Sequence, residues 1–361
     1  MERLWHGLGK AFGSAKDGAG VSSGFVSGFA GNRLRKPGQC EKSEREKQSA
    51  NPLPRCRLGD RVGRATLMES WQALILGVIE GITEYLPISS TGHLVVAQRL
   101  MGIGTETSVG AKAAADAFAI CIQGGAILAV LGLYLPRVLQ MLRGVLGKDA
   151  EGLRLALAIL IGFLPAVVLG LKFNDWIEEK LFSMWPIIGA WIVGGVAILA
   201  AAWWRRRNPP KGGAKQLLEM TWKMAVFIGL MQCVAMWPGT SRSLMTIVGG
   251  ILMGLTVQAA VEYSFLLGVL TLTAATAKKA LWKVDGVDAY HHWCGGAHLM
   301  WDTYGAVPIL IGIAAAAIAA ALAVKWLVSY LQSHGLSIFG WYRIAIGLLV
   351  GGLVLTGWVA A

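Results

Sequence analysis

Charge is scarce in this sequence. Only 15% of the 361 residues are charged, 55% are hydrophobic, and the mean hydropathy is +0.55. A soluble domain of this length carries about 25% charged residues, so the composition excludes that class and indicates an integral membrane protein. Cysteine is also scarce: the five cysteines are scattered and form no CxxC pair. A disulfide framework is therefore not expected.

The basic excess is concentrated outside the apolar segments. The net charge is +12, but the Lys and Arg residues lie in loops and in the N-terminal region. This distribution favours membrane orientation and argues against nucleic-acid binding. Residues 1–67 hold 13 Lys or Arg against 6 Asp or Glu and lack the apolar core of a secretory signal. We expect a disordered basic extension, and we favour Met68, just before the first apolar stretch, as the translation start.

Long apolar runs predict the membrane topology. Six runs have roughly the 20 residues needed to cross a bilayer. They cover residues 115–136, 153–173, 185–204, 258–277, 305–331 and 338–361. Two further stretches, 71–101 and 222–254, are interrupted by Pro87 and Pro238. Because proline breaks the helical hydrogen-bond ladder, we interpret each as two half-helices meeting at a cavity-lining break, with a kinked helix as the alternative.

The order of these segments repeats along the chain. Residues 68–211 and 212–361 each contain one broken pair followed by three full spans. If each pair re-enters on its own side, the second half is inverted relative to the first and the two breaks face each other near the midplane. The predicted fold is thus an all-α membrane protein with six transmembrane helices and two re-entrant pairs. Basic loops after the first and third spans predict that the first break opens to the outer side.

The first break carries an acidic pair followed by hydroxyls. Its sequence, from residue 80 to residue 93, is EGITEYLPISSTGH. Glu80 and Glu84 share one helix face, and two confined carboxylates either hold a divalent cation or act as an acid and a base. Ser90 and His93 follow the proline, where hydroxyls and backbone donors at a helix start can bind an anion. Such polar residues are costly in a bilayer, which favours a functional role.

The second break, PGTSRS, also offers groups that can bind an anion. Gly239 allows close backbone approach, and Arg242 offers a planar fork for phosphate oxygens. Taken singly, each serine or threonine could be bonded to its own helix, and His93 could be a satisfied interior histidine. Because the combination occurs at two related breaks, we interpret the clusters as one active site with an acid, a nucleophile, a phosphate clamp and a metal site.

A weaker metal candidate lies in the segment HHWCGGAH. It contains His291, His292, Cys294 and His298. The spacing fits no established zinc pattern, and the neighbouring tryptophans suit a membrane interface.

At these motifs the chain resembles the bacterial undecaprenyl-diphosphate phosphatase family, also known as the bacitracin-resistance family. The resemblance covers residues 68–361 and rests on GVIEGITEYLPISSTGHLVV, PGTSRSLMT, IQGGAILAV, FLPAVVLGL, EYSFLL and WYR. It implies hydrolysis of undecaprenyl diphosphate to undecaprenyl phosphate and inorganic phosphate. This reaction recycles the lipid carrier of peptidoglycan synthesis and confers bacitracin resistance, because the drug binds the diphosphate form.

The resemblance also implies residue roles. Glu80 and Glu84 would be the catalytic pair and would bind a divalent cation, Mg²⁺ or Ca²⁺. Ser90 would be the nucleophile or would position water, His93 would carry a proton or be an alternative nucleophile, and Arg242 would clamp phosphate. The substrate-binding positions would be Ser89, Thr91, Gly239, Ser241, Ser243 and Thr246.

The resemblance also implies a location and leaves a rival function. The implied location is the bacterial plasma (inner) membrane, with the site opening to the periplasmic side, and a homodimer is one option. The rival function is a polyprenyl-phosphate flippase that uses the same inverted-repeat pocket. The chain also departs from the family at residues 270–272, where a proline is expected, and in the long loop at residues 278–304.

Overall fold

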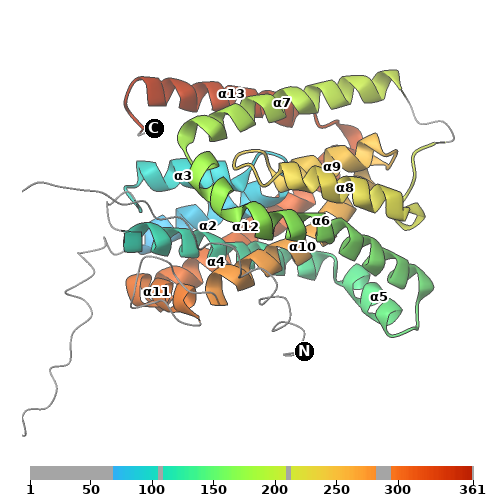
Figure 1. The fold of residues 1–361 in the computed structure, drawn as a ribbon, viewed down its shortest axis with the longest axis horizontal. Helices are drawn as coiled ribbons and strands as arrows, with labels where there is room; N and C mark the ends of the chain where they lie inside the picture. Colours follow the sequence, from blue (N-terminus) through green and yellow to red (C-terminus); the bar gives the residue numbers. More distant parts are fainter. Residues whose placement is uncertain (1–67, 105–108, 209–212, 282–293, 360–361) are drawn as a thin grey trace, which may run out of the picture. The chain divides into compact units, whose positions relative to one another are not determined.

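The chain is described by a computed structural model that covers residues 68–104, 109–208, 213–281 and 294–359 (Figure 1). These residues are almost entirely helical, and within them the only β pairing is an isolated bridge between Lys215 and Leu255. The all-α prediction is confirmed. The predictions for residues 1–67 fall outside the described residues.

Six helices are long and apolar enough to cross a membrane, as predicted. They are α4 (Val109–Leu133), α6 (Ala150–Leu181), α7 (Met184–Arg207), α10 (Val257–Leu281), α12 (Ala306–Ser333) and α13 (Ser337–Leu355). Large apolar side chains on them remain exposed, including Val193 and Leu310. In a membrane such side chains contact lipid instead of water.

The two interrupted stretches each form two separate helices. The first gives α2 (Ser70–Tyr85) and α3 (Ser90–Leu100), and the second gives α8 (Trp222–Val234) and α9 (Arg242–Leu252). Non-helical residues around Pro87 and Pro238 separate the helices of each pair. The broken pairs are therefore not simple kinks. Their re-entry from one side of the membrane stays a prediction.

Three elements differ from the sequence expectation. The apolar span of α6 ends at Phe173 as predicted, but the helix continues to Leu181 and tolerates Pro165 in its interior. Two short helices, α5 (Leu135–Val145) and α11 (Gly295–Tyr304), lie where only loops were expected. α5 packs closely on α6, because Gly144 meets the backbone at Gly152 with no side chain between them.

Small residues bring the helices that carry the site close together. Gly77 and Gly81 of α2 face the carbonyl oxygens of Gly312 and Ala316 on α12, so a side chain at either glycine would clash with that backbone. α13 lies along α7 in the same way, with Gly195 against the carbonyl of Gly340 (Figure 1). Close contact through small residues is a common way for membrane helices to associate.

Candidate active site

The two breaks touch each other, although about 150 residues separate them. Ser243, just after the second break, donates a hydrogen bond of 2.9 Å to the carbonyl oxygen of Leu86 in the first. Arg242 reaches Glu84 across the same contact. The expected meeting of the two polar clusters is confirmed.

Matching serines begin the helix that follows each break. Ser89 and Ser241 are the N-caps of α3 and α9, and their φ angles are +75° and +77°. Their hydroxyl oxygens accept from the backbone N–H of Gly92 at 3.5 Å and of Leu244 at 3.3 Å. Positive φ is uncommon for residues other than glycine, and such backbone concentrates at functional sites.

Ser90, Glu84 and Arg242 form a continuous polar chain. The hydroxyl of Ser90 donates to Glu84 Oε2 at 2.5 Å, and Arg242 Nη2 donates to Glu84 Oε1 at 2.9 Å. Arg242 Nη1 donates to the carbonyl of Ser264 at 2.9 Å. Ser90 and Glu84 are buried. Glu84 is thus placed to take a proton from Ser90, while the guanidinium offsets its charge.

A small polar cavity of about 100 Å³ lies at this chain. Its lining is Glu84, Ser89, Ser90, Thr91, Gln123, Ala235, Pro238, Gly239, Ser241, Arg242 and Leu272. The sequence predicts most of the polar members as site residues, and the structure adds Gln123 of α4. Gln123 Nε2 lies 3.5 Å from Glu84 Oε2, at the limit of a hydrogen bond.

Glu80 lies one turn before Glu84 on α2 and is fully buried. Neither of its carboxylate oxygens has a hydrogen-bond partner among the described residues. A buried carboxylate without partners is costly, so a ligand or proton is expected at this position. Hard cations such as Mg²⁺ and Ca²⁺ prefer oxygen ligands, and the two unpartnered oxygens of Glu80 are of this kind.

His93 does not line the small cavity. Its Nδ1 is 2.6 Å from the carbonyl oxygen of Ser89, and its Nε2 is 2.8 Å from the Tyr342 hydroxyl on α13. The imidazole also stacks on Tyr342 and meets the edge of Trp191. Both ring nitrogens are therefore engaged by the protein, and a role in proton transfer would require His93 to release one of these contacts.

Several predicted binding positions make structural contacts. Ser243 is bonded to Ser241 at 3.0 Å as well as to Leu86, and Thr246 pairs with the Ser264 hydroxyl at 2.6 Å. The close approach expected at Gly239 is to α7, where a side chain would meet the carbonyl of Ile187.

A fully buried arginine on α13 joins both breaks. Arg343 Nη2 donates to the carbonyl oxygens of Gly239 and Ala190, both at 2.8 Å, and Nη1 donates to that of Pro87 at 3.4 Å. Its guanidinium occupies space left by Gly194. Sequence reasoning assigned this residue no role, although it is the arginine of the WYR motif and lies inside an apolar span.

The weaker metal candidate is only partly described. His291 and His292 fall outside the described residues, whereas Cys294 precedes α11 and His298 lies in it. Among the described residues, no group of three or more His, Cys, Asp or Glu side chains could hold a metal ion.

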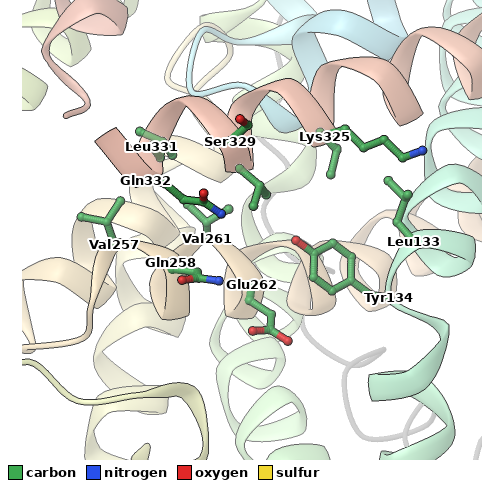
Figure 2. A pocket seen from close by; sticks show the side chains of 12 residues that line it. Leu133, Tyr134, Val257, Gln258, Val261, Glu262, Lys325, Ser329, Leu331 and Gln332 are labelled. Carbon is green, nitrogen blue, oxygen red and sulfur yellow. The ribbon is translucent and has the colours of Figure 1, made fainter. Parts of the chain in front are cut away.

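A larger cavity, of about 730 Å³, lies between the C-terminal ends of α4 and α12 and the start of α10 (Figure 2). Glu262 and Tyr134 line it, and Glu262 forms a 2.8 Å ion pair with Arg137. Burial, reinforced by the charge of Glu262, raises the pKa of Tyr134 to about 12. This cavity shares no lining residue with the polar cavity at the breaks.

Comparison with known proteins identifies the family of this chain. "Undecaprenyl-diphosphatase 2" of Rhodospirillum rubrum is 43% identical over 287 residues, covering 80% of this chain and 94% of that protein. "Undecaprenyl-diphosphatase" of Ectopseudomonas mendocina is 41% identical (78% and 94% covered), and that of Sorangium cellulosum is 40% identical (78% and 85% covered). The family described as "Bacitracin resistance protein BacA" matches residues 73–349, a span that includes both breaks and Arg343. The chain belongs to the bacitracin resistance protein BacA family.

Proposed function

We propose that this protein hydrolyses undecaprenyl diphosphate to undecaprenyl phosphate and inorganic phosphate. The observation that carries the proposal is the Ser90–Glu84–Arg242 chain at the wall of a polar cavity. The names of the relatives agree with this chemistry. The product is the lipid carrier of peptidoglycan synthesis, and its recycling confers bacitracin resistance by removing the form that the drug binds.

In the reaction, an oxygen nucleophile attacks the terminal phosphorus and the bond to the bridging oxygen breaks. Glu84 accepts the proton of the attacking hydroxyl, because its Oε2 lies 2.5 Å from Ser90 Oγ. The attacking group is Ser90 itself or a water that Ser90 positions. If Ser90 attacks, a phosphoserine forms, and water then hydrolyses it to release inorganic phosphate and restore the hydroxyl. Arg242 stabilises the negative charge that develops on the phosphate oxygens. The retained phosphate leaves on the prenyl chain, and its bridging oxygen carries the electrons of the broken bond.

We also propose a divalent cation, Mg²⁺ or Ca²⁺, at the acidic pair. The two unpartnered oxygens of Glu80 support it, with Glu84 as the neighbouring ligand. When bound, the cation would neutralise phosphate charge and lower the cost of burying Glu80. Calorimetric titration of Mg²⁺ into wild-type protein and into Glu80→Gln tests this independently of turnover. Equal binding by both proteins would refute the role of Glu80.

Transport of polyprenyl phosphate is the rival function. A site used only for transport needs anion donors such as Arg242 and the serines. A carboxylate in the cavity wall beside the phosphate would repel it, and Glu84 lies there. The acidic residue therefore favours hydrolysis, as do the names of the relatives.

We also propose on which side of the membrane the site opens. The basic segments at residues 137–154 and 205–215 support a cytoplasmic location for these two loops. The first break then opens to the periplasmic side of the bacterial inner membrane. A homodimer is compatible with this arrangement and is tested by measuring the mass of the detergent-solubilised protein.

The decisive experiment measures phosphate release from a polyprenyl diphosphate by purified protein, with and without a chelator. We expect release in the presence of Mg²⁺ or Ca²⁺ and its loss on complete chelation. A wild-type protein that releases no phosphate under any divalent cation would refute the hydrolase proposal. Full activity after chelation would refute only the proposed role of the cation and would leave the hydrolase proposal intact.

A further inference from the structure

A second cavity adjoins the polar one and has a different lining. It measures about 350 Å³ and shares Ala235, Arg242 and Leu272 with the polar cavity. The rest of its wall comes from α6, α8, α10 and residues near them, and it is mostly apolar: Ala166, Gly170, Ile177, Phe182 and Met236, with Gln232 and Thr271 as the polar members. A polar cavity beside an apolar one fits an amphiphile with a charged head and a hydrocarbon chain.

Two buried N–H donors at this junction lack partners. Gln232 is only 2% exposed, and its Nε2 has no hydrogen-bond partner among the residues that the structure describes. The same holds for Nε of Arg242. The other groups of these side chains are engaged, since Gln232 Oε1 accepts from Thr271 at 3.3 Å. Unpaired buried donors are rare because they are costly, so two of them on residues that line one cavity favour a ligand oxygen as their partner.

Gln232 is also the counterpart of Glu80 in the sequence. Gly77, Glu80 and Ser89 each lie 152 residues before Gly229, Gln232 and Ser241. The alignment pairs the two N-cap serines, whose backbone angles agree. The first half therefore has a carboxylate, an acceptor, where the second half has an amide that can donate. Such a difference suits a site that holds a cation on one side and a phosphate on the other.

We propose that Gln232 Nε2 and Arg242 Nε bind the phosphate that stays on the lipid, and that the first isoprene units occupy the apolar remainder of this cavity. The inference rests on the proposed hydrolase function and extends it to the orientation of the substrate. The terminal phosphate then lies in the polar cavity beside Ser90, with the leaving oxygen directed toward Arg242.

The test is binding of farnesyl monophosphate and of inorganic phosphate to wild-type protein and to Gln232→Met. Methionine keeps the length of the side chain and removes the donor. We expect affinity for farnesyl monophosphate to fall about tenfold or more, as for loss of a hydrogen bond to a charged group. Affinity for inorganic phosphate should stay within about twofold, because that ion binds in the polar cavity. Unchanged binding of farnesyl monophosphate, or equal weakening for both ligands, would overturn the proposal.

Thermal stability separates this role from a structural one. Thr271 keeps a 2.9 Å bond to the carbonyl of Leu267 when Gln232 is lost, so Gln232→Met should melt at the wild-type temperature or above it. The matched control is Gln98→Met: Gln98 is buried too, but its Nε2 donates to the carbonyl of Ala115 at 3.2 Å. The control should melt lower and bind both ligands normally. A destabilised Gln232→Met with normal ligand binding would mean that Gln232 is structural.

A separate variant tests whether the isoprene units occupy the apolar part of this cavity. Gly170 has only Met236 Sδ near its side-chain position, at 3.7 Å, so leucine at this helical position enters the cavity instead of the backbone. Gly170→Leu should weaken farnesyl monophosphate about tenfold and leave inorganic phosphate unchanged. The lipid-exposed Val168→Leu is the control. Because all arms measure binding, a catalytically inactive wild type would refute hydrolysis without deciding this inference. Normal binding of farnesyl monophosphate by Gly170→Leu would mean that the isoprene units do not occupy this cavity.

Discussion

At the residue scale, three contacts with the protein fix the guanidinium of Arg242. One terminal nitrogen bonds Glu84, the other bonds the carbonyl of Ser264, and the guanidinium lies 5.6 Å from the centre of the Tyr85 ring. A lysine cannot reproduce this planar, divergent arrangement. The residue is thus fixed by the protein before any phosphate arrives.

Arg242→Lys should therefore lose turnover by roughly 100-fold, about 3 kcal/mol of transition-state stabilisation, while unfolding near the wild-type temperature. Arg242→Ala should be similarly inactive and also less stable, because Glu84 loses its ion-pair partner. Turnover and thermal unfolding are measured on both variants. An active lysine variant beside a poorly folded alanine variant would mean that Arg242 serves only to pair Glu84.

The two glutamates should respond differently to amide substitution. Glu80→Gln and Glu84→Gln should each lower phosphate release by at least about 100-fold, the scale of a general acid–base contribution. In the presence of a chelator, Glu80→Gln should also raise thermal stability, because it removes a buried carboxylate that has no partner among the described residues. Glu84→Gln should lower it, since Arg242 loses its ion-pair partner. High activity in either variant would make that carboxylate structural.

At the scale of elements, Gly268 of α10 leaves the space that the Arg242 side chain occupies. A side chain at Gly268 would coincide with the guanidinium of Arg242. Gly268→Ala should therefore displace Arg242 and lower turnover about tenfold or more, although alanine favours the helix by about 1 kcal/mol. Gly132→Ala on α4, where nothing lies within 4 Å of the added carbon, is the control. Equal activity in the two variants would contradict the dependence of Arg242 on this space.

Much of the element structure could be predicted, and the reasons differ between elements. The six spans follow from run length, and the two breaks follow from Pro87 and Pro238 beside polar residues. The sequence does not predict α5 and α11, because helices of about ten residues depend on tertiary packing more than on hydropathy. The side on which His93 lies depends on where α7 and α13 pack against α3, and no local pattern contains that information.

At the scale of the whole molecule, Arg343 connects four backbone carbonyls from three parts of the chain. Arg343→Met should destabilise the protein by at least about 3 kcal/mol, because several buried carbonyls lose their donor at once. It should also lower turnover, since both breaks are released. Arg207→Met, at an exposed arginine on α7, should cost under about 1 kcal/mol. Thermal unfolding compares them, and equal melting temperatures would contradict this role for Arg343.

The position of Arg343 in the chain has a consequence for biogenesis. The ribosome makes both breaks before it makes α13, and Arg343 is about 100 residues later than Gly239. Membrane insertion of the earlier helices can therefore proceed while the two polar turns still lack their common donor. We expect enzyme competence to arise late, when α13 docks against α7, so a nascent chain stalled before residue 337 should be inserted in the membrane yet unable to turn over substrate.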